Sequence, residues 1–221
     1  MEKHWSLVNG RVVYYLSGGS AANQAIVLLH GYGMTGWVYE KLGTLLSQNY
    51  FVVIPDLPGF GKSEGLPEAK LEQIAENLIG FLEKLGLSKA IIIGHSLGGG
   101  VAIQVGRLSP KRVETLILLN SSGAPVKRSF WGWILAACKK TLKSLHRPLG
   151  AFRVSTAFTL NCFVHPLWML KTFHVVVNCD LLAELPSLGV LMKVGWSERD
   201  EYYSLPVCAA FCSAAAVRPL I

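Results

Sequence analysis

Charged residues are scarce in this chain, and it lacks the features of disordered, secreted or membrane-spanning proteins. Only 16% of its 221 residues are charged and 51% are hydrophobic, which excludes a disordered chain and indicates one domain with a sizeable core. No apolar run of signal-peptide length opens the sequence, so we expect a cytoplasmic protein. The longest uncharged stretch, residues 154–170, is interrupted by Asn161, His165 and Pro166 and falls short of a clean membrane span.

The sequence also lacks the signatures of metal, cofactor and nucleic-acid binding. Its five cysteines are odd in number and have no paired spacing, which predicts reduced, partly buried thiols and no metal site. The net charge is +7, but the basic residues belong to no nucleic-acid-binding motif. We therefore expect no cofactor and no nucleic-acid partner. Nothing in the sequence points to a particular oligomeric state.

Apolar runs of strand length alternate with helical patterns along the first half of the chain. Residues 5–8 and 11–16 flank Asn9-Gly10, a pair suited to a tight hairpin turn. Buried strands are predicted at residues 25–29, 51–54, 90–93 and 113–119, with helices near residues 37–46 and 71–85 and after residue 96. This order predicts an α/β fold, a mostly parallel twisted sheet with helices on both faces.

The character of the sequence changes near residue 124. From there to about residue 185, long apolar stretches contain no strand-like run, which predicts a helical cap insertion at 124–185 between a first core segment, 1–123, and a second, 186–221. A strand is expected again at 190–194. The tail after it contains no convincing final strand, so we expect an incomplete or atypical C-terminal end.

Ser96 stands in the pattern Gly-His-Ser-Leu-Gly, directly after the predicted strand 90–93 and before a helical stretch. This is the pattern of a nucleophile elbow, a sharp turn that presents a serine at the end of a strand. The glycines two residues either side of the serine allow neighbouring backbone to approach closely.

Four segments together resemble the α/β-hydrolase superfamily, in its branch with a helical cap. They are, in chain order, residues 30–33, residues 56–63, the Ser96 elbow and residues 195–200. The likeness implies the fold described above. It also implies a hydrophobic small-molecule substrate, a small or medium ester, with hydrolysis of a carbon–carbon bond as a related alternative. The alternative from another class is a non-catalytic binding or scaffold protein.

The resemblance also implies roles for individual residues. Ser96 would be the nucleophile and Asp200 the carboxylate that orients a histidine base. The backbone N–H groups of Tyr32 and Leu97 would form the oxyanion hole. His30 is expected to be a packed turn residue, and Asp56 to shape its loop.

No histidine follows Asp200, although the resemblance implies one there. Three explanations stay open: a truncated or altered C-terminus, a substitute base supplied by His165 or His174, or a protein that keeps the fold without the activity. Without a base, the rate should fall by about four orders of magnitude.

The segment 130–135, Phe-Trp-Gly-Trp-Ile-Leu, is aromatic and apolar and is followed by basic side chains, namely Lys139, Lys140, Lys143 and Arg147. This segment resembles an interfacial helix and predicts peripheral contact of the cap with a membrane surface. The competing interpretation, which we favour, is a cap helix that packs its aromatic side chains over the active-site cleft.

Overall fold

The computed structural model describes residues 1–125, 132, 148–198, 200 and 202–220. Within these residues, eight strands form one sheet in the order β1-β2-β4-β3-β5-β6-β7-β8. The strands are β1 (Glu2–Val8), β2 (Arg11–Gly18), β3 (Ala25–Leu29), β4 (Phe51–Pro55), β5 (Ala90–His95), β6 (Val113–Leu119), β7 (Met192–Gly195) and β8 (Pro219–Leu220). Strands β1 and β2 pair antiparallel, as do β2 and β4, and all other pairs are parallel. The predicted α/β fold with a mostly parallel sheet is confirmed.

Helices cover both faces of this sheet. The helices of the described residues are η1 (Gly36–Tyr39), α1 (Glu40–Leu46), α2 (Leu71–Lys84), α3 (Leu97–Leu108), η2 (Pro110–Arg112), α5 (Pro148–Val164), α6 (Pro166–Asn178), η3 (Leu185–Ser187) and α7 (Leu205–Ala215). Helix α1 packs on one face, where Gly43 lies against the Ile54 side chain. The larger core lies on the other face and contains Phe81 of α2, Val101 of α3 and Phe211 of α7. Every residue of β3 is buried, because the sheet is covered on both sides.

Local turn signals were read correctly from the sequence, whereas several element boundaries differ from those expected, among them the start of β1 at Glu2 and the end of β2 at Gly18. Asn9 and Gly10 have φ of 49° and 74° in the predicted hairpin, and Gly86 after α2 has φ of 69°. The helix expected from residue 37 opens as the 3₁₀ turn η1 before α1. Strand β7 begins two residues later than expected, because the chain is still turning at Gly189, where φ is 61°.

The prediction that the tail has no final strand is wrong. Helix α7 follows Asp200, and the two-residue strand β8 pairs with Val194 and Gly195 of β7. A strand of two residues has no periodicity to detect in a sequence. Its existence depends on the hydrogen bonds that β7 offers at the edge of the sheet, among them the one from the Trp196 N–H to the Leu220 carbonyl at 2.8 Å.

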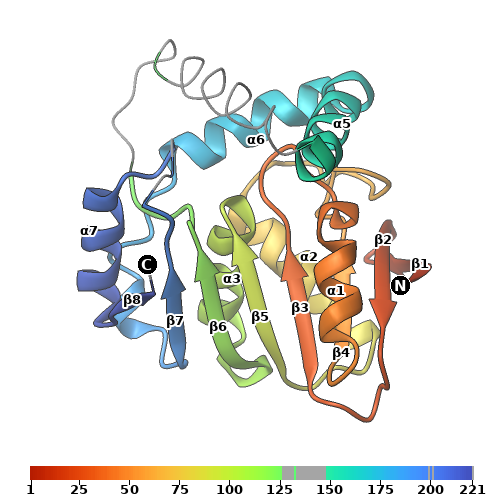
Figure 1. Cartoon of the computed structure of the whole chain (residues 1–221), viewed down its shortest axis with the longest axis horizontal. Helices are drawn as coiled ribbons and strands as arrows, with labels where there is room; N and C mark the ends of the chain where they lie inside the picture. Colours follow the sequence, from red (N-terminus) through yellow and green to blue (C-terminus); the bar gives the residue numbers. More distant parts are fainter. Residues whose placement is uncertain (126–131, 133–147, 199, 201, 221) are drawn as a thin grey trace.

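Helices α5 and α6, which we refer to as the cap helices, lie across the carboxyl ends of the parallel strands (Figure 1). Gly123 and Asp180 form an isolated bridge, and the Leu181 N–H donates to the Gly123 carbonyl at 2.7 Å. The two ends of the segment between Gly123 and Asp180 therefore lie side by side, outside the strands of the sheet. The domain boundaries at residues 124 and 185 stay predictions.

The basic part of the predicted interfacial segment, at Lys139, Lys140, Lys143 and Arg147, lies outside the described residues. So do residues 130, 131 and 133–135 of its aromatic part. In the part of the chain that is described, no helix is both long and apolar enough to cross a bilayer.

His30 joins the end of β3 to the loop after β4. Its Nε2 accepts a hydrogen bond from the Leu57 N–H at 2.9 Å, so the ring proton is on Nδ1, which donates to the Gly31 carbonyl at 2.9 Å. Burial lowers the pKa of His30 to about 4, although the bond to the Gly31 carbonyl acts in the opposite direction. The ring is fully buried and neutral. His30 is therefore the packed turn residue that the sequence predicted.

Asp56 shapes the loop that follows β4. Its Oδ1 accepts a hydrogen bond from the Gly36 N–H at 2.7 Å, and its Oδ2 accepts one from the Lys62 N–H at 3.0 Å. Burial raises the pKa of Asp56 to about 6, and those two hydrogen bonds limit the rise. The carboxyl group thereby joins the turn before η1 to the loop after β4.

Acid should destabilise the protein through His30. The ordinary histidine pKa of 6.5 falls to about 4 on folding, so the unfolded chain binds the extra proton between these values. The contribution of His30 to the free energy of unfolding is present above pH 6.5 and is lost as the pH falls toward 4, by about 3 kcal/mol in total.

Asp56 acts in the opposite direction, because its pKa rises from 3.8 to about 6 on folding and its contribution to the free energy of unfolding is lost as the pH rises through 6.

Urea unfolding of the wild type and His30→Asn, each at about pH 7 and about pH 4.5, isolates this effect because Asp56 is common to both. The wild type should lose more stability on acidification than the variant. An equal loss in the two proteins would refute the assignment.

Candidate active site

Ser96 occupies the turn between β5 and α3, at the carboxyl edge of the sheet. Its φ of 51° and ψ of −118° are a strained conformation for a residue with a side chain. Hydrogen bonds hold it there: its N–H donates to the Leu119 carbonyl at 3.1 Å, and its carbonyl accepts from the N–H groups of Gly99 at 2.8 Å and Ser122 at 3.0 Å. The backbone is therefore that of the predicted elbow.

Two glycines make this turn sterically possible. A Cβ atom on Gly98 would lie 2.5 Å from the Leu29 carbonyl oxygen, because the start of α3 packs directly on the end of β3. A Cβ atom on Gly94 would strike the carbonyl oxygen of Gly98. Neither position accepts a side chain without movement of the backbone.

The two residues predicted to supply an oxyanion hole, Leu97 and Tyr32, are both near Ser96. Leu97 is the first residue of α3, so its N–H has no acceptor within the helix. A Cβ atom on Gly31 would lie 3.2 Å from the Ser96 Cβ, and Tyr32 is the next residue. We refer to residues 31–34 as the oxyanion loop. The fold thus brings this loop and the N-terminus of α3 together at Ser96.

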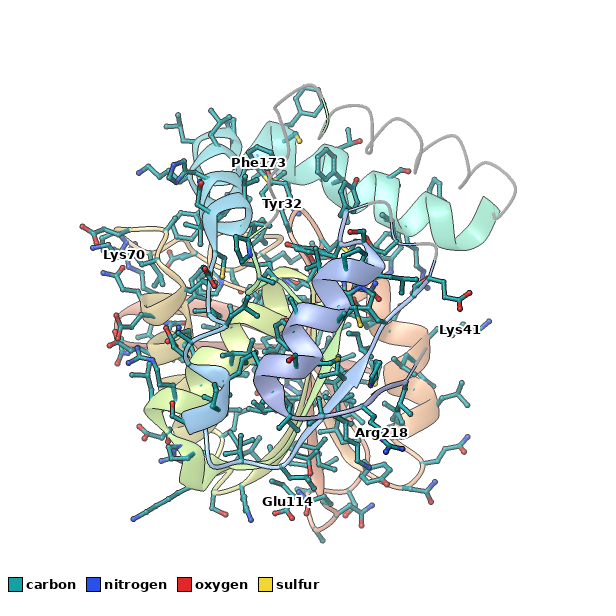
Figure 2. The ribbon with its side chains drawn as sticks, turned by 90° about the vertical axis from the view of Figure 1, so that its left-hand side faces the viewer. Tyr32, Lys41, Lys70, Glu114, Phe173 and Arg218 are labelled. Atoms are coloured by element: carbon teal, nitrogen blue, oxygen red, sulfur yellow. The ribbon has the colours of Figure 1, made fainter. Side chains whose placement is uncertain are left out.

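The side chain of Tyr32 extends from this loop to the cap helices. Its hydroxyl group donates to the Met169 carbonyl of α6 at 2.9 Å. Its ring centroid lies 6.2 Å from that of Phe158 and 5.8 Å from that of Phe173. Figure 2 shows Tyr32 and Phe173 next to each other near the cap helices. The surroundings of the oxyanion loop on this side are therefore aromatic.

Asp200 lies after β7, in contact with the end of β6. Its Oδ2 accepts a hydrogen bond from the Asn120 amide at 2.7 Å, and Asn120 directly follows Leu119, whose carbonyl binds the Ser96 N–H. Its Oδ1 accepts the N–H groups of Tyr202 at 2.6 Å and Tyr203 at 2.7 Å. The carboxylate therefore holds a tight turn beside the elbow.

Tyr203, which was not predicted from the sequence as a site residue, is placed beside Ser96 by this turn. Its side chain is 3% exposed, and among the described residues its hydroxyl group has no hydrogen bond of ordinary geometry. Burial raises the pKa of Tyr203, with further contributions from Cys179 and Asp200, and the neighbouring Ser96 side chain only partly offsets the rise. The phenol is consequently protonated at neutral pH, where it is a hydrogen-bond donor and not a base. The one sequence feature that could have drawn attention to Tyr203 is the pair of tyrosines that directly follows Asp200-Glu201.

The two histidines considered as substitute bases, His165 and His174, have other surroundings in the described structure: the first contacts a backbone carbonyl and the second is exposed to solvent. The Nε2 of His165, at the start of α6, lies 3.1 Å from the Gly61 carbonyl oxygen. His174 is exposed on α6. The ring of His95, which precedes Ser96, lies 6.4 Å from the Tyr39 ring. The structure thus brings Ser96, Asp200, Tyr32 and Leu97 to one edge of the sheet but does not bring His165 or His174 into a described hydrogen bond with Ser96.

Comparison with known proteins decides the family. A sequence profile of the alpha/beta hydrolase fold matches residues 24–168, more than half of the chain. The chain belongs to this family. It is similar to the enol-lactonase of Burkholderia xenovorans LB400 in structure, with a TM-score of 0.84 at 19% identity, over 98% of this chain and 90% of that one. This likeness shows the fold alone.

Two curated relatives are similar in sequence to parts of this chain. A dihydrolipoyllysine-residue acetyltransferase component of an acetoin cleaving system from Pseudomonas putida is 32% identical over 142 residues, covering 62% of this chain and 38% of that protein. A pimeloyl-(acyl-carrier protein) methyl ester esterase from Citrobacter koseri is 38% identical over 109 residues, covering 49% of this chain and 41% of the esterase. The chain thus spans less than half the length of these two relatives.

Gly98→Ala should destabilise the elbow. The added methyl group would lie 2.5 Å from the Leu29 carbonyl oxygen, and overpacking of this kind typically costs about 1–3 kcal/mol. Gly65→Ala is the matched control, since a Cβ atom there meets nothing closer than Trp168 at 3.5 Å. Urea unfolding should give a lower midpoint for Gly98→Ala alone. Similar midpoints for the two variants would show that α3 does not pack on β3 as described.

Two tyrosine variants should affect stability in different ways. Tyr203→Phe removes a buried hydroxyl group without a hydrogen bond of ordinary geometry, so the free energy of unfolding should stay unchanged or rise by about 1 kcal/mol. Tyr32→Phe removes the bond to the Met169 carbonyl and should lose about 1 kcal/mol. Thermal or urea unfolding compares them. A clear loss in Tyr203→Phe would mean that its hydroxyl group is bonded in the folded protein.

Proposed function

We propose that this α/β-hydrolase-fold protein is a serine hydrolase that transfers the acyl group of a small or medium hydrophobic ester to water through Ser96. The observation that carries the proposal is the strained backbone of Ser96 at the end of β5, between the oxyanion loop and the N-terminus of α3. The positive end of a helix favours negative charge that develops next to it.

The reaction would proceed in two steps. The Ser96 Oγ attacks the ester carbonyl carbon and gives up its proton to solvent water, while the carbonyl electron pair moves to the oxygen, which accepts hydrogen bonds from the N–H groups of Leu97 and Tyr32. Collapse breaks the bond to the leaving oxygen, which takes a proton from solvent and departs as the alcohol, and leaves an acyl ester on Ser96. Water then attacks this ester, a proton of the attacking water passes through solvent to the Ser96 oxygen, and the acid is released. Loss of one of the two N–H donors would raise the barrier by about 3 kcal/mol.

Proton transfer is expected to limit the rate. The side chain that Asp200 places beside Ser96 is the Tyr203 phenol, which cannot accept the serine proton at neutral pH because its own proton is firmly held. A phenol in this position can donate a hydrogen bond to an oxygen bound at Ser96. If no histidine base reaches Ser96, turnover should be about four orders of magnitude lower, and the oxyanion hole would support the residual rate.

The substrate class follows from the surroundings of the oxyanion loop. Tyr32, Phe158 and Phe173 form an aromatic group there, which favours a hydrophobic acyl chain over a charged one. The relative from Citrobacter koseri, whose name describes a methyl ester esterase, supports an ester as the reacting group.

Tyr203 also favours a second candidate function. A buried phenol beside Ser96, in place of a base, suits a protein that binds an oxygen-containing ligand without turning it over. In that case Ser96 and the two N–H groups would bind the ligand oxygen, and the elbow would be a binding site.

A fluorophosphonate probe distinguishes the two functions. We expect the full chain to be labelled slowly at Ser96, as located by mass spectrometry, and to hydrolyse p-nitrophenyl esters slowly; Ser96→Ala should lose both activities. Ser109→Ala, at the other end of α3, is the matched control and should behave like the wild type. If neither labelling nor turnover exceeds that of Ser96→Ala, the binding protein is the correct interpretation.

A further inference from the structure

We propose that Asn161 of α5 is a positioning residue for the oxyanion loop, so that the cap helices hold one of the two N–H donors in place. The inference deepens the proposed function, and it rests on that function for the role of the Tyr32 N–H. Asn161 itself lies on a cap helix, far along the chain from the loop that it contacts.

The side chain of Asn161 is 1% exposed, and both ends of its amide group are bonded to loops below the cap helices. Its Nδ2 donates to the carbonyl oxygens of Gly33 at 3.0 Å and Met34 at 3.2 Å. Its Oδ1 accepts the Gly61 N–H at 2.8 Å. An amide side chain offers hydrogen-bond donors on one side and an acceptor on the other, whereas a carboxylate has no donors and an apolar side chain has neither.

Gly33 and Met34 directly follow Tyr32 in the oxyanion loop. The loop is attached to the cap helices twice, at Tyr32 itself through its hydroxyl group to Met169, and directly after it through the Gly33 and Met34 carbonyls to Asn161. Phe158 of α5 fills the space beside Gly33, whose φ is 70°. A donor contributes to an oxyanion hole only when it is held about 3 Å from the developing charge, so small movements of this loop matter.

Loss of the Asn161 donors would leave the two loop carbonyls without these partners in a mostly buried place. Buried carbonyls without a hydrogen-bond partner are unfavourable, which favours an opened loop that water reaches. The Tyr32 N–H would then spend less time in the position that faces Ser96. The cap helices therefore act on the chemistry through the backbone, in addition to covering the site.

Asn161→Asp tests this inference because it keeps the size and the acceptor for Gly61 but removes both donors and adds a negative charge beside two carbonyls. His165→Ala is the matched control. It loses only the contact with the Gly61 carbonyl at the same end of the cap and leaves Gly33 and Met34 untouched. If Asn161→Asp fails to fold, Asn161→Ala removes the same donors without adding charge.

Hydrogen–deuterium exchange of the segment 30–36, measured on the full chain, is the first readout and needs no enzymatic activity. We expect exchange about tenfold faster in Asn161→Asp than in the wild type, and unchanged in His165→Ala. Unchanged exchange in Asn161→Asp overturns the inference. Equally faster exchange in both variants also overturns it, since it would indicate a general loosening of the cap.

The second readout separates a positioning role from a structural one. For p-nitrophenyl acetate, whose acetyl group offers no chain for the cap to bind, kcat and the rate of fluorophosphonate labelling should fall about tenfold in Asn161→Asp with little change in KM. Ser109→Ala, at the far end of α3, should match the wild type in both. A rise in KM alone overturns the positioning role. A third outcome separates the two proposals. If exchange is faster in Asn161→Asp but no protein, including the wild type, is labelled, the attachment of the loop by Asn161 is confirmed and the proposed hydrolase function is refuted.

Discussion

The direct packing of α3 on the end of β3 is the contact on which the candidate site depends. It brings Gly98 against the Leu29 carbonyl and so forces Ser96, two residues earlier, into a strained backbone conformation. Strain of this kind costs on the order of 1–3 kcal/mol and persists only where surrounding structure determines it. Here two features hold Ser96 in this conformation. They are its hydrogen bonds to Leu119 and Ser122 and the complete burial of β3.

The end of β6 organises the other half of the site. The Leu119 carbonyl binds the N–H of Ser96, and the next side chain, Asn120, binds Asp200. Asp200 in turn fixes the backbone of Tyr203. One strand end thus sets the distance between the serine and the turn after β7, and small shifts of β6 would move both together. The chemistry of the side chain that the turn presents is independent of this framework, and at Tyr203 it is a phenol.

Features with local causes could be predicted from the sequence, whereas those with distant causes could not. The elbow and the buried strands depend on glycine spacing and apolar runs within a few residues of one another, as at Gly94 and Gly98. The position of Asn161 depends on Gly33, 128 residues away, and no pattern near either residue indicates the pairing. Tyr203 and β8 escaped prediction for a similar reason, since the first depends on the Asp200 turn and the second on β7. His30 was predicted correctly because its partners lie at the ends of adjacent strands.

The bridge between Gly123 and Asp180 has a consequence for how such proteins diversify. Because Gly123 and Asp180 pair with each other outside the strands of the sheet, the segment between them is a closed excursion that leaves the strand order unaffected. The entropic cost of closing a loop grows only slowly with its length, so inserts of very different size fit the same two attachment points. A replacement insert would keep the sheet and the elbow intact, provided that it restored the hydrogen bonds that now hold the oxyanion loop.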